Sequence, residues 1–183
     1  FDDTVGIHGI AEGGWNLSRR YVQDIRIIGA DLIPESAFLA LSNHPGMTDT
    51  LALFAALNRK DLRIIALDRP FLNALPHTTA QLFYVYDDPA KRMTLVRQVS
   101  AHLKKGGAIL TFPAGHIEPD PDIYPGAVES LKEWTDSVGV FIRMAPEAAI
   151  LPVLVRNVVA KKYANHWLLR IKKTKEEKEK LAT

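Results

Sequence analysis

Short apolar runs alternate with longer segments of helical periodicity through most of the chain. Five runs are apolar at nearly every position, a pattern typical of strands that are buried on both faces of a sheet. They cover residues 37–41, 62–67, 82–86, 108–112 and 149–155. Because helical segments separate these runs, we expect an α/β domain with a mainly parallel or mixed sheet and helices on both faces. Pro152 in the last run indicates an edge strand or a bulge.

The clearest helical segment covers residues 89–104. Its apolar positions recur every three or four residues, Pro89 suits a first helical position, and Asp87 or Asp88 can cap the amides there. Gly106 and Gly107 follow its end, as is usual for helices. Helices or helical turns are also predicted for residues 15–22, 50–57, 69–75 and 126–144, with Pro76 stopping the third of them.

The remaining segments have weaker patterns. Residues 1–13 contain three glycines and no periodicity, so we expect an irregular arm. Residues 25–29 indicate a short strand that Gly29 ends, and residues 167–171 indicate one more strand. The Lys- and Glu-rich end of the chain is most simply a solvated helix.

Composition limits the classes of protein that fit. With 183 residues, 47% hydrophobic and 24% charged, the chain is typical of one soluble globular domain, which we expect to span residues 1–183. A start at Phe1 rather than at Met leaves room for a longer chain. The formal charge of +2 does not favour a nucleic-acid partner, and the absence of cysteine excludes a thiolate nucleophile. No stretch reaches the roughly 18 apolar residues of a membrane span.

A turn that carries a histidine follows the first apolar run. Asn43-His44-Pro45-Gly46 is a turn cluster, and Asp49 stands at the start of the next helix, where unpaired amides favour an acidic side chain. Asp49 can still turn back toward His44, and a histidine oriented by a carboxylate is a general base. A turn histidine beside a helix-capping aspartate would give the same pattern without any catalytic role.

A second junction between a strand and a turn also carries a histidine. The strand at residues 108–112 runs into a Pro-Ala-Gly-His turn at 113–116, and a loop rich in proline and aspartate follows. In parallel α/β sheets ligands bind at the carboxyl ends of the strands, so both turns are expected at one edge of the sheet. This shared location strengthens the interpretation of His44 as a site residue.

The order of these segments resembles the glycerolipid acyltransferase family, which includes the enzymes that acylate lysophosphatidate. The family's Asn-His-x4-Asp block reads Asn43-His44-Pro45-Gly46-Met47-Thr48-Asp49 here, and its Phe-Pro-Glu-Gly-Thr block reads Phe112-Pro113-Ala114-Gly115-His116. Its last block, a strand with Pro-Val, is matched by Leu151-Pro152-Val153. The similarity spans residues 25–156, and the order of the blocks at strand ends makes it specific.

The resemblance implies transfer of a fatty acyl group from a thioester, on coenzyme A or acyl carrier protein, to the hydroxyl of a glycerolipid or a related lipid. His44 would take the hydroxyl proton and Asp49 would orient it, with no metal and no cofactor besides the acyl donor. Gly115 could offer its amide to the developing oxyanion. Substrate contacts are implied for Asn43, Gly46, Phe112, Pro113, Gly115 and His116.

One departure from the family's pattern concerns the acceptor. The family has an Arg that meets the acceptor's phosphate at the end of the strand that corresponds to residues 82–86, but Asp87 and Asp88 stand there in this chain. Arg69 and Arg92, near the ends of core strands, are the remaining candidates for a phosphate contact. The sequence therefore predicts a hydroxyl lipid of low negative charge, or a zwitterionic one, as the acceptor.

Two alternatives to this function stay open at the level of sequence. His116, Glu118, Asp120 and Asp122 form a His-x-Glu-x-Asp-x-Asp run that could ligate a metal in a metal-dependent hydrolase. A lipid-binding relative without turnover is the other alternative, because Ala114 and His116 replace the family's Glu and Thr.

The substrates implied by the resemblance lie in a bilayer, although the chain has no membrane span. We expect a cytoplasmic protein that attaches peripherally to the membrane surface. The amphipathic helix at residues 15–22 and the tail at 170–183, with a net charge of +3, are the expected contacts.

Overall fold

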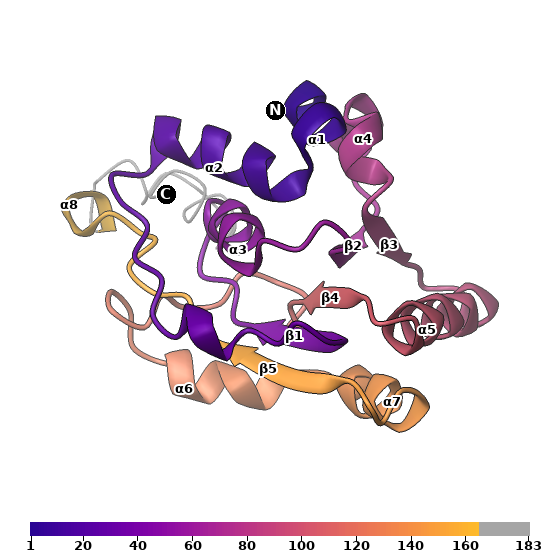
Figure 1. Ribbon diagram of the computed structural model, residues 1–183. Helices are drawn as coiled ribbons and strands as arrows, with labels where there is room; N and C mark the ends of the chain where they lie inside the picture. Colours follow the sequence, from indigo (N-terminus) through magenta and orange to yellow (C-terminus); the bar gives the residue numbers. More distant parts are fainter. Residues whose placement is uncertain (165–183) are drawn as a thin grey trace.

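The computed structural model describes residues 1–164. Its core is a five-stranded sheet in which every strand pair is parallel. The strands are β1 (Phe38–Ser42), β2 (Arg63–Leu67), β3 (Leu82–Val85), β4 (Ala108–Thr111) and β5 (Ala149–Val153), in the spatial order β3-β2-β4-β1-β5. The α/β class and all five predicted core strands are therefore confirmed (Figure 1). β5 lies at an edge of the sheet, as Pro152 indicated.

Helices cover both faces of the sheet because strand residues alternate between two cores. Phe38 and Ala40 of β1 belong to one core, whereas Leu39 and Leu41 belong to the other. Three helices cover the first core: α1 (Asp2–His8), α2 (Ile10–Tyr21) and α3 (Asp49–Leu57). Two helices cover the second: α5 (Pro89–Lys104) and α7 (Ser137–Met144). In Figure 1, α1, α2 and α3 lie above the sheet, whereas α5 and α7 lie at its right and lower right.

Short helices make the remaining connections. They are η1 (Ala30–Leu32), η2 (Pro70–Ala74), α4 (Pro76–Thr79), α6 (Ala127–Ser130), η3 (Leu131–Glu133) and α8 (Lys161–Ala164). Asp88 caps α5 by accepting a hydrogen bond from the Lys91 amide at 3.1 Å, as predicted. Pro76 not only stops the turn before it but also begins α4, where a missing N–H costs nothing.

The prediction of an irregular arm at residues 1–13 is wrong, because the segment forms α1 and the first part of α2. The glycines of α1 and α2 allow these helices to approach their neighbours closely. A Cβ on Gly14 would lie 2.6 Å from the Leu51 oxygen, and one on Gly6 would lie 2.8 Å from the His77 ring. Glycine therefore marks tight helix packing at this end of the chain, where sequence alone indicated a loop.

The predicted strand at residues 25–29 is also wrong. The segment connects α2 to η1 and pairs with none of the described strands. β-branched side chains favour extended backbone, but a strand also needs a neighbour, and β4 and β5 occupy both sides of β1. Ile28 is accordingly 81% exposed. The strand predicted at 167–171 and the predicted C-terminal helix lie outside the described residues.

None of the helices within residues 1–164 has the length and apolar character needed to cross a bilayer.

Candidate active site

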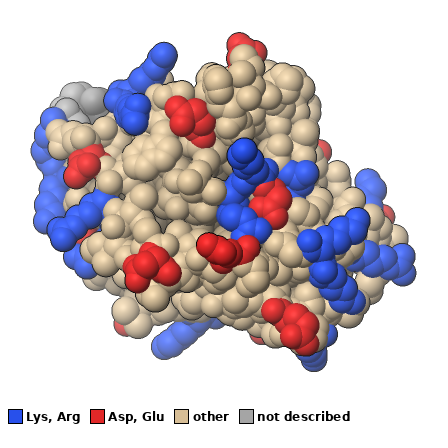
Figure 2. Space-filling view, viewed as in Figure 1, with Lys and Arg blue, Asp and Glu red and all other residues tan. Residues whose placement is uncertain are grey.

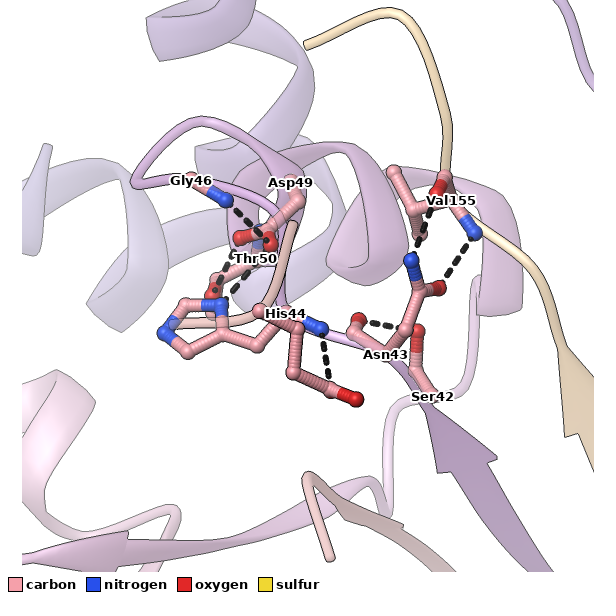
Figure 3. A network of polar contacts seen from close by, with 8 residues as sticks. Ser42, Asn43, His44, Gly46, Asp49, Thr50 and Val155 are labelled. Atoms are coloured by element: carbon pink, nitrogen blue, oxygen red, sulfur yellow. Dashed lines mark hydrogen bonds and ion pairs between the residues drawn. The ribbon is translucent and has the colours of Figure 1, made fainter. Parts of the chain in front are cut away.

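His44 and Asp49 contact each other at the carboxyl end of β1. The turn after Ser42 presents His44, and Asp49 is the first residue of α3, so the strand and the helix bring the two side chains together. Asp49 Oδ2 lies 2.7 Å from His44 Nδ1. Figure 3 shows that the second ring nitrogen, Nε2, points away from Asp49. The His44 side chain is 24% exposed whereas that of Asp49 is fully buried.

Donors on both carboxylate oxygens fix the orientation of Asp49. Oδ2 also accepts a hydrogen bond from the Gly46 amide at 3.2 Å, and Oδ1 accepts from the amide and the hydroxyl of Thr50. The start of α3 further favours a negative charge at this position. With Asp49 as acceptor, a neutral His44 carries its proton on Nδ1, and Nε2 is left as the available base.

Phe112 lies against the His44 ring. The ring centroids are 4.5 Å apart and the ring planes meet at 31°. β1 and β4 are parallel neighbours with Leu41 opposite Thr111, so residues that follow the two strands meet at one edge of the sheet. The two predicted strand-to-turn junctions therefore come together, and Phe112 gives the site an apolar wall.

Asn43 and Gly46 form hydrogen bonds to protein groups next to the His–Asp pair. The Asn43 side chain donates to the Val155 carbonyl and accepts from the Val155 amide, both at 2.8 Å. Figure 3 shows this side chain turned toward Val155 and away from His44. Asn43 therefore ties the end of β1 to the segment after β5. Its expected contact with substrate stays a prediction.

The turn after β4 uses polar groups that the sequence assigned to substrate. The Gly115 amide donates to the Phe112 carbonyl at 3.0 Å, so it closes the turn. Gly115 has φ of +71°, in the left-handed region that favours glycine. Pro113 is buried, and His116 Nε2 lies 3.0 Å from Glu133 Oε2. Phe112 is the residue of this block whose ring packs against His44.

Arg69 follows β2, and Arg92 lies in α5, the helix after β3. Both strands lie on the side of β4 away from β1 and His44. Arg92 Nε donates to the Tyr86 carbonyl at 3.0 Å, and its Nη2 lies 3.6 Å from Asp87 Oδ1. Its side chain therefore folds back over the start of α5. Arg69 is exposed just before η2 and forms no ion pair within the residues that the structure describes. Arg69 is thus the more available cation of the two.

The acidic loop that could have held a metal binds protein groups instead. Asp120 accepts hydrogen bonds from the amides of residues 157–159, and Asp122 forms a two-point ion pair with Arg156. The Arg156 guanidinium holds the pKa of Asp122 below its usual range. Across residues 1–164, no three His, Cys, Asp or Glu residues are placed to hold one metal ion. The ligand set of the metal-dependent hydrolase does not assemble.

Sequence reasoning missed the contact between Glu118 and His44, because it considered Glu118 as one of four possible metal ligands in the loop after β4. Glu118 is 1% exposed. Its Oε2 accepts from the His44 amide at 3.0 Å, and its own amide donates to the His44 carbonyl at 2.7 Å. The sequence offers only a carboxylate between Ile117 and Pro119 as a signal, and burial of a loop carboxylate depends on tertiary contacts.

The fold and this geometry define a class of protein, a parallel α/β domain with a carboxylate-bound histidine at the carboxyl edge of its sheet. The chain belongs to the Acyltransferase family, whose model matches residues 24–156. That span contains the whole sheet and the His–Asp pair, so the resemblance predicted from the sequence blocks is confirmed. No curated protein and no solved structure matches the chain.

Proposed function

We propose that this acyltransferase moves a fatty acyl group from a thioester to the hydroxyl of a lipid, with His44 as general base. The observation that carries the proposal is the 2.7 Å contact of His44 Nδ1 with Asp49, which leaves Nε2 facing outward beside Phe112. A neutral imidazole with its proton on Nδ1 has a free lone pair on Nε2, so it can accept a proton from a hydroxyl.

The reaction needs one proton to move twice. Nε2 of His44 takes the proton of the acceptor hydroxyl while its oxygen bonds to the thioester carbonyl carbon. The carbon–sulfur bond of the tetrahedral intermediate then breaks, and the leaving thiolate takes this proton from Nε2 to form the free thiol. Asp49 offsets the positive charge that His44 carries between the two steps. Because the chain contains no cysteine, direct attack on the donor thioester is the simplest route.

Product analysis tests this function. The protein is incubated with a lipid extract and with acyl-coenzyme A or acyl carrier protein, and acylated lipids and free thiol are measured by mass spectrometry and a thiol assay. We expect both products with at least one donor and neither with the His44→Ala variant. A folded wild-type protein that binds lipid but turns over neither donor would instead support the non-catalytic relative.

The charges around the site support an acceptor of low negative charge. Asp87 is exposed where the resemblance places a phosphate-binding Arg, and Arg92 is already bound to Asp87 and to the Tyr86 carbonyl. Two carboxylates at this edge, Asp87 and Asp88, repel a phosphate monoester unless another cation outweighs them. A neutral or zwitterionic hydroxyl lipid avoids this repulsion.

We also propose peripheral attachment to a membrane surface through the segment from the end of α2 to η1. Residues 19–32 expose apolar side chains next to basic ones: Tyr21, Ile27, Ile28 and Leu32 with Arg19, Arg20 and Arg26. Figure 2 shows basic side chains along the side of the molecule where Figure 1 draws α8 and the end of α2. Such a mixture suits the interface of a bilayer that contains anionic lipid.

This location differs from the one expected from sequence. The helix predicted at 15–22 packs its inner face against α3, with Gly14 in close contact and Ser18 fully buried. We therefore expect flotation with anionic vesicles at low salt, and weaker flotation at high salt. Ile28→Ser combined with Leu32→Ser should reduce it, whereas Val128→Ser, at a 74% exposed position of α6, should not. Failure of the wild-type protein to float at low salt would remove the proposal.

A further inference from the structure

Glu118 holds the main chain of His44 from both sides. The Glu118 carboxylate accepts from the His44 amide at 3.0 Å, and the Glu118 amide donates to the His44 carbonyl at 2.7 Å. Asp49 holds the ring of the same residue at Nδ1. His44 is therefore anchored at its backbone by the loop after β4 and at its ring by the start of α3.

The second oxygen of the Glu118 carboxylate is also occupied. Oε1 accepts from the Trp134 indole N–H at 2.9 Å and from the Ser130 hydroxyl at 3.1 Å. Two of the three donors, the His44 amide and the Trp134 indole, can only donate. Both terminal atoms of the side chain at position 118 must therefore be hydrogen-bond acceptors. The two oxygens of a carboxylate meet this requirement, whereas a primary amide has one oxygen and one NH₂ group. Glu118 forms no ion pair within the described residues, so its three hydrogen bonds are all from neutral donors.

We propose that Glu118 is a positioning residue that fixes His44 for proton transfer, an inference that rests on the proposed role of His44 as general base. Nε2 must lie within hydrogen-bond reach of the acceptor hydroxyl, and its place is set by the backbone of residue 44 as well as by Asp49. A displacement of the base by about 1 Å can cost on the order of 100-fold in rate. Loss of the Glu118 anchor should therefore lower kcat with little change in KM.

Glu118→Gln tests the requirement for two acceptor ends. The amide group that it introduces must face either the His44 amide or the Trp134 indole, and two N–H groups then oppose each other. We expect kcat to fall about 100-fold. Adding Trp134→Phe removes the indole donor, so the new oxygen can accept from His44 while its NH₂ donates to Ser130. The double variant should regain most of the lost kcat, which a purely destabilising pair of changes would not do.

Asp120→Asn is the matched control. Asp120 belongs to the same loop, is also 1% exposed, and binds main-chain amides, but these amides belong to residues 122 and 157–159. Asp120→Asn should lower the midpoint of thermal unfolding, as Glu118→Gln does, and leave the kcat of the folded protein unchanged. Equal losses of kcat in the two variants, or wild-type kcat in Glu118→Gln, would overturn the inference.

A measurement that needs no turnover separates this inference from the proposed function. Hydrogen exchange of the His44 amide, followed by NMR, should be at least about tenfold faster in Glu118→Gln than in the wild type or in Asp120→Asn. If the wild-type protein transfers no acyl group, the proposed function fails, while the exchange rates still decide whether Glu118 positions His44. Unchanged exchange in Glu118→Gln would show that it does not.

Discussion

The polar side chains at the carboxyl edge of the sheet differ in burial and hydrogen bonding between its two halves. The inner half, at the ends of β1, β4 and β5, contains Asn43, Asp49 and Glu118, which are buried and hydrogen-bonded to neighbouring main chain. The outer half, at the ends of β2 and β3, contains Arg69 and Asp87, which are exposed. Within residues 1–164, the ion pair found there is between Arg92 Nη2 and Asp87 Oδ1, which are 3.6 Å apart.

On the proposed function, we expect this difference to separate the residues of the chemistry from those that select the acceptor. A buried polar group that loses its partner costs about 1–3 kcal/mol, so the inner half tolerates few changes and keeps His44 in one position. Exposed ion pairs contribute about 0–1 kcal/mol, so charges on the outer half can change with little effect on the fold. Substitutions in the inner half should act on kcat, and those in the outer half on the choice of acceptor.

The largest effect is expected from His44→Ala. Removal of the base should lower kcat by about 10⁴-fold, at the upper end of what general-base catalysis contributes. The fold should persist because His44 is partly exposed and Asp49 keeps its donors Gly46 and Thr50. His8→Ala, an exposed histidine at the end of α1, is the control, and circular dichroism checks the fold. A folded His44→Ala protein with near-normal kcat would contradict the assignment of catalysis to the inner half.

Asp49→Asn should have the next largest effect, a loss of about 10³-fold in kcat. The introduced amide must face either the donors of Thr50 or those of Gly46 and His44, so one side of the network is broken. A misplaced proton on the His44 ring then leaves Nε2 protonated and unable to accept. Steady-state kinetics and the ring-nitrogen NMR shifts of His44 measure both consequences. An unchanged tautomer with unchanged kcat would contradict the role of Asp49.

The outer half is expected to change acceptor preference by about tenfold, since its charges are solvated. Acceptors at equal concentration, with lysophosphatidate and a neutral hydroxyl lipid among them, are compared by kcat/KM. We expect the neutral lipid to be preferred, and Asp87→Asn to reduce that preference severalfold. Asp87 is the better position to change because Asp88 also caps α5.

A clear preference of the wild-type protein for lysophosphatidate would reverse this part of the comparison. If Arg69→Ala or Arg92→Ala then removed that preference, the outer half would bind phosphate as the sequence resemblance implies for the family. The kcat with the neutral lipid is the internal control, because neither Arg contacts the His–Asp pair.

Sequence reasoning predicted the sheet well because nearly continuous apolar runs have few other uses in a chain of this size. It failed in the N-terminal part of the chain, before β1, where two opposite errors have related causes. The glycines of α1 and α2 indicated a loop because their purpose, close contact with α3 and with His77, depends on tertiary packing. Residues 25–29 have strand propensity, but no position beside β1 was left for them.

In the site too, local contacts could be predicted from the sequence and long-range contacts could not. The spacing of His44 and Asp49 across a strand and a helix start is local, so the sequence predicted their contact. Glu118 lies 74 positions from His44, and Val155 lies 112 positions from Asn43, so these contacts could not be inferred from spacing. The oxyanion role of Gly115 stays a prediction. The hydrogen bond of its amide to the Phe112 carbonyl is local, since a Pro-x-Gly turn commonly uses that amide to close itself.

The smallest effect is expected from a substitution that lowers the stability of a segment next to the outer half and leaves the inner half unchanged. Asp2 of α1 accepts hydrogen bonds from the amides of His77 and Thr78 and from the Thr78 hydroxyl, so it caps α4, the helix that leads into β3. Burial alone would raise the pKa of Asp2, but the hydrogen bonds from Thr78 and His77 outweigh it and lower the pKa. Asp2→Asn should therefore cost about 1 kcal/mol of unfolding free energy at neutral pH and leave kcat unchanged.

The pH dependence gives this last prediction its sign. A carboxyl whose pKa is lower in the folded than in the unfolded state stabilises the protein above its unfolded value of about 3.9. That stabilisation disappears as the pH falls through the folded pKa. Urea unfolding should show the difference between wild type and Asp2→Asn at pH 6 and a smaller one at pH 3. Asp3→Asn, an exposed neighbour in the same turn, is the control, and a difference that grew on acidification would contradict the cap.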